Sequence, residues 1–69
     1  MPSYSVEEAV KQSGSVSEFI SQLLKDLERE HGQYKVRSGG LNYDLHEFAD
    51  GTIFKITASY GRIYVEQVG

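Results

Sequence analysis

The sequence predicts an α+β fold of two layers, with one or two N-terminal helices packed on a four-stranded antiparallel meander in the order 1-2-3-4. Apolar residues follow a helical spacing before Gly32 and alternate with polar residues after it. Three glycine-containing pairs then mark turns: Gly39-Gly40, Asp50-Gly51 and Tyr60-Gly61. The 69 residues suffice for a single domain, 1–69, with a helical half over 1–32 and a meander over 33–69.

A short first helix is predicted from Val6 to Ser13. Ser5 precedes Glu8 by three residues, which is the spacing of a capping box. Gly14 suits the position after the last turn, because glycine adopts a left-handed backbone without strain. The apolar stripe is narrow and consists of Val6, Ala9 and Val10.

The second helix begins after Ser15, which forms another capping box with Glu18, and ends before Gly32. His31 lies in its last turn, where the helix dipole favours a cation. One face of this helix is apolar, and we expect that face to cover the sheet. Its residues are Val16, Phe19, Ile20, Leu23, Leu24 and Leu27.

The register of the meander follows from treating each glycine pair as a two-residue turn, since turn length fixes which residues face each other. This assumption places two apolar rows toward the helices: Tyr34, Leu45, Ile56 and Val65, and then Val36, Tyr43, Ala58 and Ile63. The same register places four rows on the other face. They are Lys35, Asp44, Thr57 and Tyr64; Gln33, His46, Lys55 and Glu66; Arg37, Asn42, Ser59 and Arg62; and Phe48, Ile53 and Val68. Free edges are expected at Gln33–Ser38 and Arg62–Val68.

Composition excludes several classes of protein. Seven basic and ten acidic residues give a net charge of -3, which argues against a strongly basic nucleic-acid binder. The absence of cysteine excludes a thiolate metal site and a thiol nucleophile. The longest apolar run, Ile63 to Val65, is too short to span a membrane, so we expect no membrane partner. A reduced cytoplasm is the default expectation for the location.

Neither catalysis nor metal binding is predicted, and no cofactor is expected. His46 lies near Asp44 and Lys55 in the predicted register, but an open sheet face neither excludes water nor stabilises an oxyanion. Glu66, the third conceivable metal ligand, lies two strands away, with Lys55 between it and His46. The expected role of His46 is that of a solvated side chain.

Protein association is the function that the pattern favours most. Three apolar residues in one row of a solvent-facing sheet need a cover. That cover is the first helix, a second copy or a different protein. The sequence therefore predicts a non-enzymatic interaction or regulatory module that binds another protein or itself, as a homodimer, through the outer sheet face or a sheet edge. The predicted contact residues are Phe48, Ile53, Tyr64 and Val68, with Arg37 and Arg62 at the rim.

Two alternatives use other surfaces. The first is weak binding of single-stranded nucleic acid, in which a basic and aromatic sheet face contacts phosphates and bases. Its residues are Lys35, Arg37, Lys55, Arg62 and Tyr64. The second is an acidic inhibitor of the phage or mobile-element type, because residues 1–32 carry six acidic and three basic residues. Lys11, Lys25 and Arg29 interrupt that acidic series.

Overall fold

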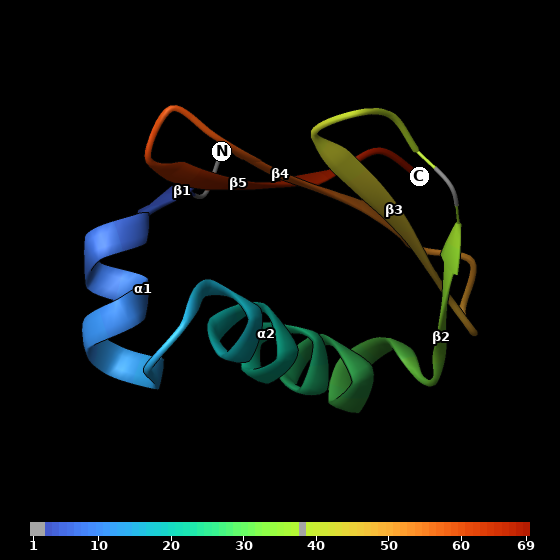
Figure 1. Cartoon of the computed structure of the whole chain (residues 1–69). Coiled ribbons are helices and arrows are strands. Elements are labelled where there is room, and N and C mark those ends of the chain that lie inside the picture. The colour runs from blue at the N-terminus through green and yellow to red at the C-terminus, as the bar shows by residue number, and fades with distance from the viewer. Residues whose placement is uncertain (1–2, 38) are drawn as a thin grey trace.

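The computed structural model describes residues 3–37 and 39–69 and shows two helices packed against one five-stranded antiparallel sheet (Figure 1). The strand order is β1-β5-β4-β3-β2. The predicted α+β architecture of two layers is confirmed, with five strands in place of four. The elements are β1 (Ser3–Ser5), α1 (Val6–Ser13), α2 (Val16–His31), β2 (Tyr34–Arg37), β3 (Tyr43–Phe48), β4 (Ile53–Ser59) and β5 (Arg62–Gln67).

Both helices begin and end as their capping residues predict. The hydroxyl of Ser5 accepts a hydrogen bond from the backbone N–H of Glu8 at 2.9 Å. The hydroxyl of Ser15 accepts one from Glu18 at 3.1 Å. Gly14 ends α1 with a φ of 91° and donates its N–H to the carbonyl of Val10. Each of these contacts spans only three or four residues, so the local sequence determines it.

The additional strand, β1, pairs antiparallel with β5 and places Tyr4 opposite Ile63. The guanidinium of Arg62 donates to the hydroxyl of Ser3 at 3.0 Å, and the N–H of Val6 donates to the carbonyl of Gly61 at 2.9 Å. The expectation of a free edge at Arg62–Val68 is therefore wrong over the part of β5 that β1 covers. A strand of three residues, whose last residue Ser5 is also the N-cap of α1, has no alternating pattern from which it could be predicted.

The β4–β5 hairpin has the predicted register. Ile56 faces Val65, and Ala58 faces Ile63. Tyr60 and Gly61 both have positive φ, 51° and 71°, as a two-residue type I′ turn requires.

The β3–β4 register differs from the prediction by one residue, which exchanges the two faces of β3. Its loop holds three residues rather than two. Gly51 has a φ of 91° and donates to the carbonyl of Phe48 at 3.0 Å, while Phe48 donates to the carbonyl of Thr52 at 2.8 Å. This is a type I turn followed by a left-handed glycine, the common three-residue hairpin loop. His46 consequently faces Phe54.

The β2–β3 register also differs. Arg37 lies opposite Leu45 instead of Asn42. The connection is longer than the two-residue Gly39-Gly40 turn that the sequence predicts. Gly40 donates its N–H to the carbonyl of Tyr43 at 3.1 Å, and a Cβ atom on Gly40 would lie 2.5 Å from the Tyr43 ring. Ser38, the last residue of the predicted strand, lies outside the described residues.

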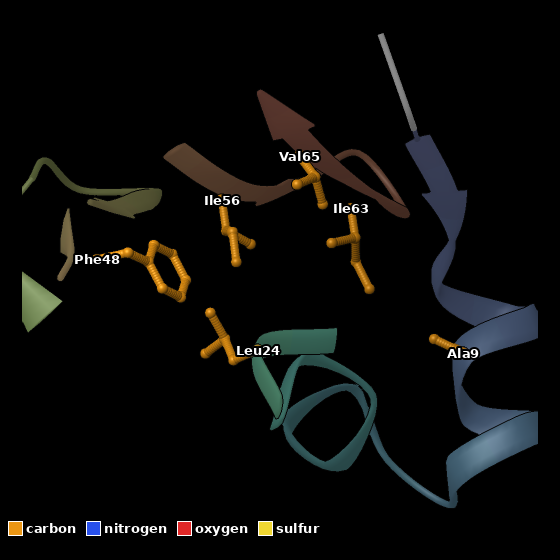
Figure 2. Packing of buried hydrophobic residues seen from close by; sticks show 6 residues of the cluster. All are labelled: Ala9, Leu24, Phe48, Ile56, Ile63 and Val65. Atoms are coloured by element: carbon orange, nitrogen blue, oxygen red, sulfur yellow. The ribbon is translucent and has the colours of Figure 1, made fainter. Parts of the chain in front are cut away.

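The core lies between α2, α1 and the sheet face that the helices cover. Figure 2 shows Ile56, Ile63 and Val65 directed from the sheet toward the helix layer, where Leu24 faces them. Phe48 projects into the same space from β3 and is only 3% exposed. The buried hydrophobic residues are Ala9, Leu24, Phe48, Ile56, Ile63 and Val65.

Candidate interaction surface

The outer face is the side of the sheet opposite the helices, and it is the candidate site. Figure 1 shows α1 and α2 on the same side of the sheet. Within the described ranges, no element covers the other side. The expectation that the first helix is one possible cover of this face is therefore wrong, because α1 buries Ala9 in the core instead.

An aromatic row crosses the three central strands of the outer face. Tyr43 on β3 lies opposite Thr57 on β4, and Thr57 lies opposite Tyr64 on β5. All three side chains are half-exposed. The two rings are two strands apart, about 9–10 Å at the usual strand spacing. Thr57 lies between them, and the Tyr43 ring packs against Gly39 and Gly40 of the β2–β3 loop.

Aliphatic side chains lie beside this aromatic row. Leu45 faces Lys55 in the next row, and Ile53 faces Glu47 in the row after it. Leu45 and Ile53 are half-exposed. The middle of the outer face thus combines two aromatic and two aliphatic side chains, which is typical of the centre of a protein interface.

Several charged groups of the outer face have a partner on the same face. Lys55 Nζ lies 4.4 Å from the centre of the Tyr43 ring, a cation–π contact, and Lys55 also faces Glu66. Arg37 Nη1 lies 3.7 Å from Glu47 Oε1. Because these groups are exposed, each pair contributes little to stability. Four cations and two carboxylates leave a surplus of two positive charges: Lys35, Arg37, Lys55 and Arg62 against Glu47 and Glu66.

The predicted contact residues do not all reach this surface. Ile53 and Tyr64 lie on the outer face with Arg37 and Arg62. Val68 is 48% exposed just beyond β5, where its N–H donates to the carbonyl of Ile53 at 2.8 Å.

Phe48 is the exception and corrects the prediction, since it belongs to the core. The one-residue difference in register that buries Phe48 also turns Tyr43 and Leu45 outward, whereas the predicted register places both in the core. The Asp50-Gly51 pair does not distinguish the two loops, because glycine suits the last position of a two-residue and of a three-residue loop.

The residues of the nucleic-acid alternative share the outer face. The β3–β4 pairing and the β2–β3 pairing each differ from the predicted register by an odd number of residues. Each odd difference exchanges the two faces of a strand, so two of them return β2 to its predicted orientation. Lys35 and Arg37 therefore stay on the predicted side of the sheet. Tyr43 joins the predicted set, which is Lys35, Arg37, Lys55, Arg62 and Tyr64.

The acidic residues behind the inhibitor alternative lie on the helix side of the molecule. Asp26 forms an ion pair with Arg29 at 3.7 Å, which offsets part of the negative charge. The remaining acidic side chains of both helices, apart from a half-buried Glu28, are exposed: Glu7, Glu8, Glu18 and Glu30.

His46 is buried rather than solvated, which overturns its predicted position on the outer face. It is 5% exposed, and its ring makes an edge contact with Tyr34 at 5.7 Å between centres. Nδ1 has no hydrogen-bond partner among the described residues. Burial lowers the pKa of His46 below 6.5, and this effect exceeds the opposing influence of Asp44 and the Phe54 backbone. A neutral, buried imidazole has no access to a substrate.

His31 ties the end of α2 to the β3–β4 loop. Its Nδ1 lies 2.7 Å from Asp50 Oδ2 and 3.4 Å from the hydroxyl of Thr52. The other ring nitrogen, Nε2, lies 3.6 Å from Glu30 Oε2, a carboxylate at the position where a catalytic triad places its nucleophile. The backbone N–H of Asp50 also donates to the carbonyl of His31 at 3.2 Å. This cluster therefore holds the hairpin against the helix.

Asp50 is the residue of this cluster whose acidity changes. The Thr52 N–H and hydroxyl, followed by His31, lower the pKa of Asp50 from 3.8 to about 2. The N–H of Thr52 donates to Asp50 Oδ1 at 2.9 Å. The carboxylate is therefore ionised at neutral pH and fixes the loop that sets the register of β3.

No group of three His, Asp or Glu residues in the described ranges is arranged to hold a metal ion. In the same ranges, neither helix is long and apolar enough to cross a membrane. Comparison with known proteins finds no matching protein family, curated protein or solved structure. The function is therefore argued from the surface alone.

Proposed function

We propose that this chain is a non-enzymatic protein-interaction module that self-associates through its outer sheet face. The observation that supports the proposal is the half-exposed apolar centre of the outer face, formed by Tyr43, Leu45, Ile53 and Tyr64, which no helix covers. Aromatic residues are enriched among the residues that carry most of the energy at protein interfaces. Charged groups surround this centre, as in the polar rim of an interface.

Size favours a second copy as the partner. A small domain without disulfides buries little apolar area on its own, and association adds to it. A standard interface takes about 800 Å² from each partner, roughly one sixth of the 4671 Å² surface of this chain. The accessible area of one sheet face in a domain of this size is about as large as such an interface requires. The outer face also carries cations and carboxylates, so each copy offers both signs of charge to the other.

The test is the mass in solution, measured by light scattering from micromolar to millimolar concentration. The wild-type chain should exceed its monomer mass of 7.8 kDa as concentration rises. Tyr64→Glu should restore the monomer because it places a charge in the centre of the face. Tyr60→Glu is the matched control, since the same substitution in the exposed β4–β5 turn lies outside the aromatic row.

Circular dichroism of both variants separates lost association from lost folding. Leu45→Lys is a second probe of the same face should Tyr64→Glu unfold. A wild-type chain that stays monomeric at millimolar concentration would contradict self-association. So would a dimer that survives both Tyr64→Glu and Leu45→Lys.

Single-stranded nucleic acid is the second candidate, and the position of Tyr43 favours it. Tyr43 and Tyr64 flank Thr57, and Lys55 of the neighbouring row lies over the Tyr43 ring, so the face resembles the basic and aromatic surfaces on which unpaired bases stack. The net charge of -3 and the two carboxylates on the face place this candidate second. A labelled oligothymidylate titrated at low salt tests it by fluorescence anisotropy. Binding that is lost in Arg37→Glu with Arg62→Glu, and kept in Tyr60→Glu, would favour nucleic acid.

A further inference from the structure

The free edge of β2 is a second surface, distinct from the outer face. β2 pairs with β3 on one side, and no strand of the described residues pairs with its other side. Val36, in the middle of β2, is 61% exposed. Unpaired backbone groups on an edge strand are a template for another chain.

The hydrogen-bond pattern shows which backbone groups are free. Ala49 donates its N–H to the carbonyl of Gln33 at 2.8 Å, so these two form a hydrogen-bonded pair of the ladder. Such pairs alternate along antiparallel strands. The backbone of Lys35 and Arg37 therefore bonds to β3. The N–H and C=O groups of Tyr34 and Val36 point to the open edge.

The side chains of β2 alternate between two cations on one face and two largely apolar residues on the other. Lys35 and Arg37 lie on the outer face, while Tyr34 and Val36 lie on the helix side. Glu47 forms an ion pair with Arg37 at 3.7 Å and is also the cross-strand neighbour of Lys35, so these two cations have one carboxylate opposite them. The edge therefore has surplus positive charge on one face and an exposed apolar side chain on the other.

This charge pattern argues against a second copy at the edge. A two-fold antiparallel pairing of β2 with itself brings Lys35 and Arg37 of one copy beside the same cations of the other. Like charges that face each other across strands are destabilising. An extended chain with acidic side chains at alternate positions would place them beside Lys35 and Arg37 and would place its intervening apolar residues beside Val36.

We propose that the β2 edge binds an extended acidic segment of another protein, which adds to the sheet as a sixth strand. Backbone hydrogen bonds to Tyr34 and Val36 supply affinity. Contacts with Lys35 and Arg37 select alternating acidic residues. This proposal does not depend on self-association through the outer face.

The probe is a blocked peptide of alternating glutamate and valine, with a lysine–valine peptide of the same length as its control. The wild-type chain should bind the acidic peptide, more weakly at higher salt, and should not bind the basic one. Lys35→Glu with Arg37→Glu should abolish binding. Failure of the acidic peptide to bind, or equal binding of both peptides, would overturn the proposal.

Val36→Pro isolates the backbone contribution. It removes one N–H from the open edge without removing a bond to β3, and proline is tolerated at such edge positions. Binding should weaken about tenfold, as expected for one lost hydrogen bond. Val36→Ala, the matched control, keeps the N–H and should bind more tightly than Val36→Pro. Equal affinity of the two variants would contradict strand addition.

Two further measurements make these results decisive. Amide hydrogen exchange at Tyr34 and Val36 should slow when the peptide binds the wild-type chain, and unchanged exchange there would contradict the proposed position. Tyr64→Glu should keep peptide binding, because Tyr64 lies on β5. Failure of self-association is thereby distinguished from failure at the edge.

Discussion

Replacing Phe48 by alanine tests the register of β3 through the stability of the protein. The ring is 3% exposed, and its centre lies 5.5 Å from that of Tyr34 and 5.8 Å from those of Phe54 and His31. Burying a phenylalanine removes about 150–250 Å² from water, worth about 4–6 kcal/mol at about 25 cal/mol per Å². The methyl group of alanine and relaxation of the cavity reduce the expected loss to about 3–5 kcal/mol.

That loss is a large share of the total for a chain of 69 residues. Domains are stabilised by roughly 0.05–0.15 kcal/mol per residue, which gives about 3–10 kcal/mol here. Urea unfolding followed by circular dichroism measures the change, with Phe48→Leu as a milder variant that keeps most of the volume. Should Phe48→Ala be unfolded without denaturant, Phe48→Leu still gives a measurable shift in midpoint.

Leu45→Ala is the matched comparison, because β3 presents these two residues to opposite faces. Leu45 is half-exposed on the outer face, so its loss should be about 1 kcal/mol or less. In the register of a two-residue Asp50-Gly51 turn, Leu45 is in the core and Phe48 faces solvent. A larger loss for Leu45→Ala than for Phe48→Ala would therefore refute the three-residue loop and the surface built on it.

Three further predictions concern single positions. Tyr60→Asn should stabilise the protein by about 1 kcal/mol, because tyrosine is strained at positive φ and its 99% exposed ring loses no packing; a lower melting temperature would contradict this. The wild-type chain should lose stability as pH falls from 3.8 to about 2, since Asp50 has a lowered pKa when folded and the unfolded chain binds the proton more readily. Asp50→Asn should reduce that slope, and an identical acid profile in urea unfolding would argue against the contact with Thr52 and His31. Burial lowers the pKa of His46 in the folded state, so the unfolded chain binds a proton more readily and the stability of the wild-type chain should decline as pH falls below 6.5. His46→Leu should remove this decline in the free energy of unfolding. If the dependence of stability on pH is the same in both proteins between neutral and mildly acidic pH, His46 is solvated.

The helices could be predicted from sequence because their signals are local. Ser5, Ser15 and Gly14 each make their capping contact within four residues, and the apolar stripe of α2 repeats over 16 residues. The Tyr60-Gly61 turn was equally local, so the register of β4 and β5 followed from it. β1 could not be predicted, because its pairing with β5 joins segments at opposite ends of the chain.

The candidate surface was predicted correctly on β4 and β5, because the turn between these strands has the predicted length. Ile53, Lys55, Tyr64 and Arg62 lie on β4 or β5 and keep their predicted side. The faces of β3 depend on whether the Asp50 loop holds two residues or three. A glycine after aspartate is compatible with both lengths, and the contact between Asp50 and His31 that accompanies the longer loop comes from a helix 19 residues away.

The most direct test of the outer face as the site of self-association is a concentration series of amide and side-chain NMR spectra. From micromolar to millimolar protein, we expect shifts concentrated at Tyr43, Leu45, Thr57 and Tyr64, and none of comparable size along the solvent side of α2. Shifts confined to the helices, or spectra that do not change with concentration, would contradict it.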